Sequence, residues 1–316
     1  MALSAPTRAW LQIHFCVILW GFTAILGKLI SLPAATLVWW RMVLVTVALL
    51  LFRQFWAGLR PLGIRLIAIY AGIGVIVSLH WLTFYGSVKL ANASVAATCM
   101  ALTPVFIAFV EPWIARRRFD SRELIFGIAV IPGVALVVGG TPAGMRLGIA
   151  TGVLSAFLVA IFGSLNKRFI GHSDALTVTG LEMGAGAIGM TLLVPLLVDQ
   201  HEWLVLPGLR DTLYLLALAI GCTLLPFALS LVALRHLSAF SSALAVNMEP
   251  VYSVLLAIVL LGEQRQLDTA FYAGVAVLLV VVFSHPLFVR HPPGTTEVVL
   301  TDGVAGVGQP GRDTND

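Results

Sequence analysis

Ten long apolar segments, joined by short connections, dominate this sequence and most constrain its fold. An α-helix needs about 20 mostly apolar residues to cross a bilayer. Only 11% of the residues are charged, against about 25% in soluble domains, so the chain cannot cover itself with a water-compatible surface. We therefore predict an all-α integral membrane protein with ten transmembrane helices. The segments are residues 11–30, 33–52, 64–86, 92–114, 123–140, 147–166, 175–198, 212–234, 240–262 and 269–289.

The two ends of the chain need separate interpretation. The first segment, 11–30, resembles a signal peptide in length, but it contains Trp20 and Lys28 and lacks a convincing small-residue cleavage site. We interpret it as a retained helix, because many further spans follow it. A short N-terminus, 1–10, precedes it. The tail, 290–316, turns abruptly polar and rich in Gly and Pro, so we expect it to be disordered.

The distribution of basic residues orients the predicted bundle. An even number of spans places both termini on one side of the membrane, and most Lys and Arg lie in the loops of that side. In membrane proteins the cytoplasmic loops carry this excess. We therefore predict a protein of the plasma membrane, or bacterial inner membrane, with both termini in the cytoplasm. The opposite loops hold only Lys28, Lys89, Arg146, Arg210 and Arg265, and Arg41 alone falls within a span.

Composition and motifs argue against several other classes. The net charge of +4 does not indicate nucleic-acid binding, because the basic residues lie at the ends of apolar segments. The three cysteines, Cys16, Cys99 and Cys222, are isolated within such segments, so we expect buried thiols rather than a metal or redox site. The sequence contains no Walker A loop, dinucleotide fingerprint or His-Glu-x-x-His site. We therefore expect no cofactor, and a small molecule and the lipid bilayer as the partners of a monomer or homodimer.

The two halves of the chain resemble each other. The stretch "LANASVAATCMALTPVFIAFV", residues 90–110, aligns without a gap to "HLSAFSSALAVNMEPVYSVLL", residues 236–256. Further upstream, "LWGFTAILGK" (19–28) aligns to "LVAIFGSLNK" (158–167). Each half has five spans, an odd number, so the second half enters the membrane from the opposite side. This arrangement is an inverted repeat, which lets a transporter present two related gates to a central site.

These stretches, with "NMEPVYSVLLAIVLLGEQ" and "FYAGVAVLLVVVF", resemble the drug/metabolite transporter superfamily, specifically a ten-span member with two EamA-type repeats. The resemblance covers about residues 11–289, as a first repeat at 11–140 and a second at 147–289. It implies ten helices around a central cavity and an alternating-access carrier of small metabolites. Such repeats often close their fourth helix with a Gly-Glu pair. The second half has Gly262-Glu263, but the first has Arg116-Arg117.

Two charged residues within spans are candidate substrate contacts. Arg41 lies in the second span, and Glu182, its approximate counterpart in the repeat, lies in the seventh. A charge inside the bilayer is costly unless it faces a cavity or a partner. Opposite charges at related positions suggest a pair across the central cavity, where Arg41 would bind a carboxylate or phosphate and Glu182 would orient the substrate or bind its amine. The alternative is a structural ion pair that never meets substrate.

Glu249 directly precedes Pro250 in the ninth span, and Thr103-Pro104 occupies the related position of the fourth. Proline removes a backbone donor and frees a carbonyl of the preceding turn, which lipid-facing helices tolerate only next to protein or a watery cavity. We therefore predict that Pro104 and Pro250 are kink or hinge positions and that Glu249 is an ion- or proton-coupling group. The alternative is a carboxyl hydrogen-bonded to a neighbouring helix.

An aromatic cluster in the third span is the other candidate for the pocket. His80, Trp81, Phe84 and Tyr85 are spaced to share one helical face, which would suit a planar or zwitterionic substrate. Plain packing of aromatic residues is the alternative. Two further candidate polar contacts in the ninth span are Asn247 and Tyr252, and an interhelical hydrogen bond is equally compatible with Asn247.

The function predicted from these features is secondary active transport, not enzymatic catalysis. Without an ATP-binding domain, a substrate or ion gradient must drive an exporter or exchanger of a small metabolite, possibly an amino acid. Nucleobases, nucleosides, sugars and cationic drugs remain alternative substrates, because a fold does not fix its substrate. A membrane-embedded enzyme or lipid-handling protein is the alternative from another class, and it would need clustered catalytic groups that the scattered histidines do not provide.

Overall fold

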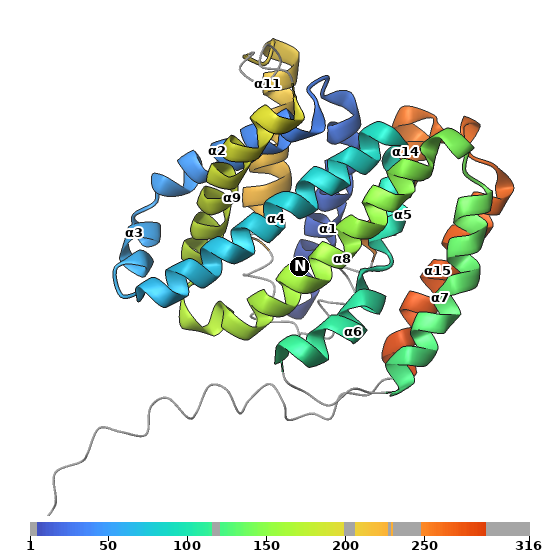
Figure 1. Ribbon diagram of the computed structural model, residues 1–316, viewed down its shortest axis with the longest axis horizontal. Helices are drawn as coiled ribbons and strands as arrows, with labels where there is room; N and C mark the ends of the chain where they lie inside the picture. The colour runs from blue at the N-terminus through green and yellow to red at the C-terminus, as the bar shows by residue number, and fades with distance from the viewer. Residues whose placement is uncertain (1–4, 116–120, 199–205, 227–228, 230–247, 289–316) are drawn as a thin grey trace, which may run out of the picture.

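The computed structural model describes residues 5–115, 121–198, 206–226, 229 and 248–288, and all its regular elements there are helices (Figure 1). The sequence-predicted Asn247 and the tail, 290–316, lie outside the described residues. The α-helices are α1 (Ala5–Leu29), α2 (Ala34–Leu50), α3 (Arg53–Leu59), α4 (Ile64–Leu90), α5 (Ala93–Met100), α6 (Thr103–Ala115), α7 (Ser121–Gly139), α8 (Arg146–Phe169), α9 (Ala175–Leu197), α11 (Leu209–Leu216), α14 (Glu249–Leu261) and α15 (Thr269–Phe288). The shorter elements are η1 (Ala143–Met145), η2 (Ile170–His172), η3 (Ala217–Leu224) and η4 (Glu263–Arg265).

Several of these helices have the length and composition of membrane spans. In the described part of the chain, four helices are long and apolar enough to cross a bilayer, and two bent pairs raise this number to six. The pairs are α2 with α3, bent by 87°, and α5 with α6, bent by 46°. Shorter apolar helices cover 128–139, 249–261 and 269–281. The described part of the chain is therefore all-helical, with helices that have the length and composition expected of a membrane protein.

The long helix α4 lies at the centre of the larger core. It packs against α8, α9 and α2, and Figure 1 shows it crossing the molecule between α9 and α8. The fully buried Tyr70 and Tyr85 of α4 belong to this core. A second core joins α7 and α15 with parts of α5 and α8. Apolar side chains such as Trp113 and Leu196 remain exposed on the outside, as expected of a surface that faces lipid.

Glycines allow α9 to approach its neighbours closely. A Cβ added at Gly180 would lie 2.4 Å from the Phe55 ring of α3, and one at Gly186 would lie 2.7 Å from the sulfur of Met42 on α2. On α4, a Cβ at Gly74 would lie 2.1 Å from the backbone oxygen of Glu182. Small residues at these positions therefore let the helices approach closely.

The predicted fourth span is not one continuous helix. It divides into α5 and α6 at residues 101–102, and Pro104 lies in the first turn of α6, where a missing N–H leaves no hydrogen bond unmade. The N-terminus of α5 is capped by Asn92, whose side chain accepts from Val95 N. Glu263 adds two bonds, because its carboxylate accepts from Ala93 N at 2.9 Å and from Ser94 N at 2.8 Å.

This carboxylate gives the Gly262-Glu263 pair a structural role. Gly262 ends α14 in the left-handed conformation, with φ of 65°, which glycine adopts without a steric penalty. The turn places Glu263 against the start of α5, where the carboxylate is 1% exposed. A negative charge is stabilised at a helix N-terminus, so the Gly262-Glu263 pair stabilises the contact between α14 and α5. The related Arg116 and Arg117 lie outside the described residues.

Candidate functional site

The guanidinium of Arg41 is buried where α2, α4 and η3 meet, and the residue is 5% exposed. Its Nη1 donates to the hydroxyl of Tyr85 at 2.7 Å. Its Nε and Nη2 both donate to Thr223 Oγ1, at 3.1 and 2.8 Å. The Cζ atom lies 3.7 Å from the centre of the Trp81 ring. Arg41 is therefore held in position by neutral hydroxyl groups and an aromatic face.

These partners do not use all the hydrogen-bond donors of the guanidinium. Arginine has five N–H donors, and the structure gives Arg41 three hydrogen bonds. Within the described residues, no carboxylate bonds directly to Arg41; the group whose carboxyl feels its charge is Glu249 of α14. Arg41 is therefore a buried cation with two unused N–H donors and no bonded anion among the described residues. Such a group is suited to bind an anionic group of a ligand.

A local irregularity of the backbone supplies Thr223. The element η3 is a π-helix, a conformation often found at functional sites, and its Thr223 hydroxyl also donates to Leu218 O. Sequence analysis did not single out Thr223. A threonine in an apolar run is unremarkable by itself, and the π-helix that directs it toward Arg41 has no clear sequence signal.

The aromatic cluster of α4 divides between two faces rather than sharing one. Trp81 and Tyr85 contact Arg41. His80 instead faces α8, where its Nδ1 lies 2.8 Å from Ser155 Oγ and its ring lies 5.4 Å from that of Phe162. Successive helical residues are separated by about 100°, so His80 follows its own stripe with Phe84. Two of the four residues therefore line the Arg41 site.

Glu182 is not bonded to Arg41 as an ion pair, and the two residues have different neighbours. Arg41 is adjacent to Met42, which packs on Gly186 of α9. Glu182 precedes Gly186 by about one helical turn, and it faces Asn166 of α8 and Tyr70 of α4. The register between α2 and α9 thus separates the two charges along the helix axes. Sequence symmetry places related residues in related positions, but it does not bring them into contact.

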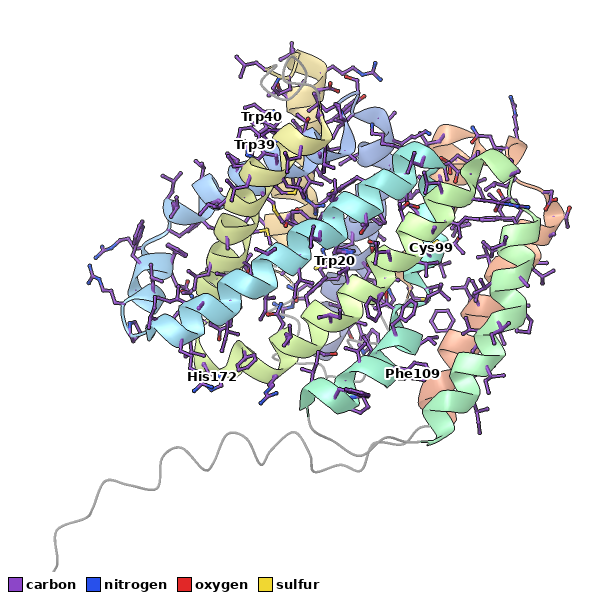
Figure 2. The ribbon with its side chains drawn as sticks, viewed as in Figure 1. Trp20, Trp39, Trp40, Cys99, Phe109 and His172 are labelled. Carbon is purple, nitrogen blue, oxygen red and sulfur yellow. The ribbon has the colours of Figure 1, made fainter. Side chains whose placement is uncertain are left out.

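The remaining predicted residues lie around α14. Tyr252 shares a hydrogen bond of 3.1 Å with Nδ1 of His14 on α1, and His14 stacks on Trp10. Glu249 and Pro250 form the first turn of α14. Trp39 and Trp40, which precede Arg41 in α2, have ring centres 4.9 Å apart, and Figure 2 shows them near one end of α9. Trp39 donates to Thr191 Oγ1 of α9 at 2.8 Å.

The site offers binding groups rather than catalytic or metal-binding clusters. In the part of the chain that the structure describes, no group of three or more His, Cys, Asp or Glu could hold a metal ion. The thiols of Cys16, Cys99 and Cys222 are buried and free. The arrangement around Arg41 can bind an anion and present aromatic surface beside it, and both properties suit reversible recognition of a small molecule.

Comparisons with known proteins agree with this description. One solved crystal structure, whose title says only that it is of a protein, is 19% identical to this chain. It covers 88% of this chain and 96% of its own, with a TM-score of 0.56, which shows a shared fold. No curated protein matches. The profile of the EamA-like transporter family matches twice, over residues 8–139 and 146–285. The chain therefore belongs to the EamA-like transporter family.

Proposed function

We propose that this chain is a secondary active transporter that exports or exchanges a small metabolite bearing a carboxylate or phosphate, with an amino acid as the leading substrate class. The observation that carries the proposal is the buried Arg41, whose recorded hydrogen-bond partners are all neutral. A guanidinium keeps its charge, and a charge inside a membrane protein marks a substrate or ion pathway by default. The substrate's anionic group is the counter-charge that this position needs.

Glu249 is the proposed coupling group. The charge of Arg41 acts on its carboxyl, so a substrate anion at Arg41 and the ionised form of Glu249 compete for the same cation. A proton on Glu249 would relieve that competition when substrate is bound. Release of the proton would restore Glu249 as the counter-charge of an empty Arg41. Binding and release of this proton would couple substrate movement to proton movement.

The proposed architecture is ten spans in two inverted halves. In its support, the packing of α4 on α8 corresponds to that of α1 on η3, and the packing of α5 and α6 on α8 corresponds to that of α14 on α1. The pairs α2 with α9 and α7 with α15 are each formed by related helices of the two halves. Such a pattern is expected of a two-fold axis in the membrane plane, on which alternating access depends.

Ligand-induced thermal stabilisation of the purified full chain tests the proposed site. The panel contains amino acids, other carboxylates, phosphate esters, nucleobases, sugars and organic cations. A ligand at about a hundred times its dissociation constant stabilises the folded protein by about 2.7 kcal/mol. Stabilisation by an anion-bearing metabolite that disappears in Arg41→Gln supports the proposal. The exposed Arg146 provides the control, because Arg146→Gln removes the same charge and should leave the response intact.

The opposite pattern would overturn the proposal. If only organic cations, nucleobases or sugars stabilise the protein, and Arg41→Gln leaves their effect unchanged, Arg41 is a structural residue and the substrate class is different.

The variant Arg41→Lys makes the test more specific. Lysine keeps the charge but lacks the planar fork that binds carboxylates with two parallel hydrogen bonds. We expect it to bind the same ligand more weakly rather than to lose it.

A further inference from the structure

A second polar site lies apart from Arg41, between α9, α8 and α4. Glu182 occupies the third turn of α9, seven residues after Ala175, and is 6% exposed. Its backbone oxygen lies against Gly74 of α4. Its carboxyl lies within hydrogen-bonding reach of Asn166, near the end of α8. Glu182 thus has α4 against its backbone and Asn166 of α8 at its carboxyl, about 10 Å along α9 from the start of the helix at a rise of about 1.5 Å per residue.

Two oxygen atoms in this site have no hydrogen-bond partner. Among the described residues, Glu182 Oε1 and Asn166 Oδ1 are both buried and unpaired. An ionised carboxyl and an amide oxygen are both acceptors only, so neither can satisfy the other. Buried polar atoms of native proteins are almost always paired, and the cost of leaving them unpaired is greatest in a low-dielectric interior. Glu182 Oε1 and Asn166 Oδ1 therefore each lack a donor.

We propose that Glu182 and Asn166 form a second proton-binding site of this carrier, besides Glu249, in which the protonated Glu182 carboxyl pairs with the Asn166 amide. One proton from water bonds to Oε1 and turns an acceptor into a donor. The acid then donates to the amide oxygen, while the amide N–H donates to the other carboxyl oxygen. Both oxygens are buried away from solvent, and a proton is the smallest cation that could pair them.

The charged groups around the site do not provide an alternative donor. Tyr70 of α4 is a titratable group on which the charge of Glu182 acts, and its hydroxyl already donates to Phe169 O at 2.7 Å. Arg41 of α2 is bonded to Tyr85 and Thr223. Arg53 of α3 is exposed, and Arg168 of α8 is exposed and donates to Ile114 O. Within the described residues, a proton on Glu182 itself is the donor that completes the pair.

The position of this site gives it a role that Glu249 does not have. Helix α4 touches the Arg41 site through Trp81 and Tyr85 and the Glu182 site through Gly74. One rigid helix therefore has contacts at both places. A proton held by Glu182 would stabilise the contact of its side chain with Asn166 of α8, and its release would weaken that contact. This role in transport depends on the function proposed above, but proton binding by Glu182 does not.

Infrared spectroscopy of the purified full chain in lipid tests proton binding directly, because a protonated carboxyl has its own carbonyl stretching band. At pH 7 we expect such a band in the wild type, its loss in Glu182→Gln and its retention in the control Glu249→Gln. In Asn166→Leu the carboxyl remains but loses its amide partner, so the band should shift in frequency. This second variant keeps the test valid if Glu182→Gln fails to fold.

The proposal is overturned if the spectra of Glu182→Gln and the wild type are the same at pH 7, or if Asn166→Leu leaves the band at its original frequency. The first result would mean that Glu182 is ionised, and the second that Asn166 is not its partner. Neither result depends on an anion site at Arg41. A failure of the substrate proposal would leave the band of Glu182 in place, so the two proposals fail separately.

Discussion

At the scale of single residues, the buried charge of Arg41 cannot be explained by the packing of an apolar helix alone. Its hydrogen bonds to Tyr85 and Thr223 and its stacking on Trp81 fix the guanidinium, but they do not neutralise it. Burial of a charge costs several kcal/mol unless a counter-charge compensates it. The compensation proposed here comes alternately from Glu249 and from substrate.

Tyr85→Phe should weaken substrate binding with little loss of stability. The change removes the hydroxyl to which Arg41 Nη1 donates and keeps the buried ring. The guanidinium then loses an anchor, and we expect the affinity for the stabilising anion to fall about tenfold, equivalent to about 1.4 kcal/mol. Tyr70→Phe is the matched control on the same helix, because its hydroxyl bonds only to the backbone of Phe169. Equal losses in both variants, measured by ligand titration, would contradict the prediction.

The sequence predicted Arg41, Trp81 and Tyr85 as site residues because charge and aromatic rings stand out in apolar spans. It could not predict that Thr223 would join them, since that depends on a π-helix. It was also misleading about the aromatic cluster, because His80 bonds to Ser155 of α8 instead of facing Arg41. Residue type indicates which side chains need a partner, but helix rotation decides which partner each one meets.

At the scale of helices, the breaks between helices reveal more about the fold than the positions of the spans do. The predicted boundaries agree with most described helices to within a few residues, because charges, glycines and prolines mark where apolar runs end. The bend of 87° between α2 and α3 was not predicted, whereas the interruption between α5 and α6 lies next to Pro104, which was predicted as a kink or hinge position. The contact of Glu263 with the start of α5 joins residues that are distant in sequence, and no local pattern shows such a contact.

Glu263→Gln should destabilise the protein by about 2–3 kcal/mol, because hydrogen bonds to a charged group contribute about 1.5–3 kcal/mol. Glutamine can accept from one of the two backbone N–H groups of α5, but its own NH₂ then faces the other. Thermal unfolding in detergent measures the loss. The exposed neighbour Gln264 is the control, and Gln264→Ala should change stability by no more than about 0.5 kcal/mol. Comparable effects of the two changes would contradict the capping role.

Gly74→Ala tests the close approach of α4 to α9. The new methyl would lie 2.1 Å from the backbone oxygen of Glu182, so the helices must separate, at an expected cost of about 1–3 kcal/mol or more. Gly72 lies two residues away on the same helix, and a Cβ there meets nothing within 4 Å. Gly72→Ala should therefore be neutral or slightly stabilising, because alanine favours a helix over glycine. Thermal unfolding that ranks the two variants equally would show that α4 and α9 are not this close.

At the scale of the whole molecule, the two halves of the chain are joined along much of their length. Helices α2 and α4 of the first half pack on α8 and α9 of the second, and α7 packs on α15. Sequence similarity between the halves predicted related folds, but similarity does not say which surfaces meet. In helices that are apolar on all sides, apolar periodicity gives almost no information about which face is buried. The rotation of each helix relative to its neighbours could therefore not be predicted.

Reporter fusions test the proposed orientation of the whole molecule. A fluorescent protein that matures only in the cytoplasm should be bright when fused after Arg60 or Gly171, and an alkaline phosphatase that is active only outside should be inactive there. The reverse is expected after Leu90 or Leu209. The physical reason is the excess of basic residues in the loops assigned to the cytoplasm. A bright cytoplasmic reporter after Leu90 or Leu209 would invert the orientation.

Counterflow in proteoliposomes tests the central claim most directly. Vesicles containing the purified full chain are loaded with the metabolite that stabilises it, and uptake of the same labelled metabolite is followed over time. The account predicts transient accumulation by the wild type and by Arg146→Gln, and none by Arg41→Gln. Undiminished accumulation by Arg41→Gln would contradict it, because a carrier that works without this cation does not bind its substrate there.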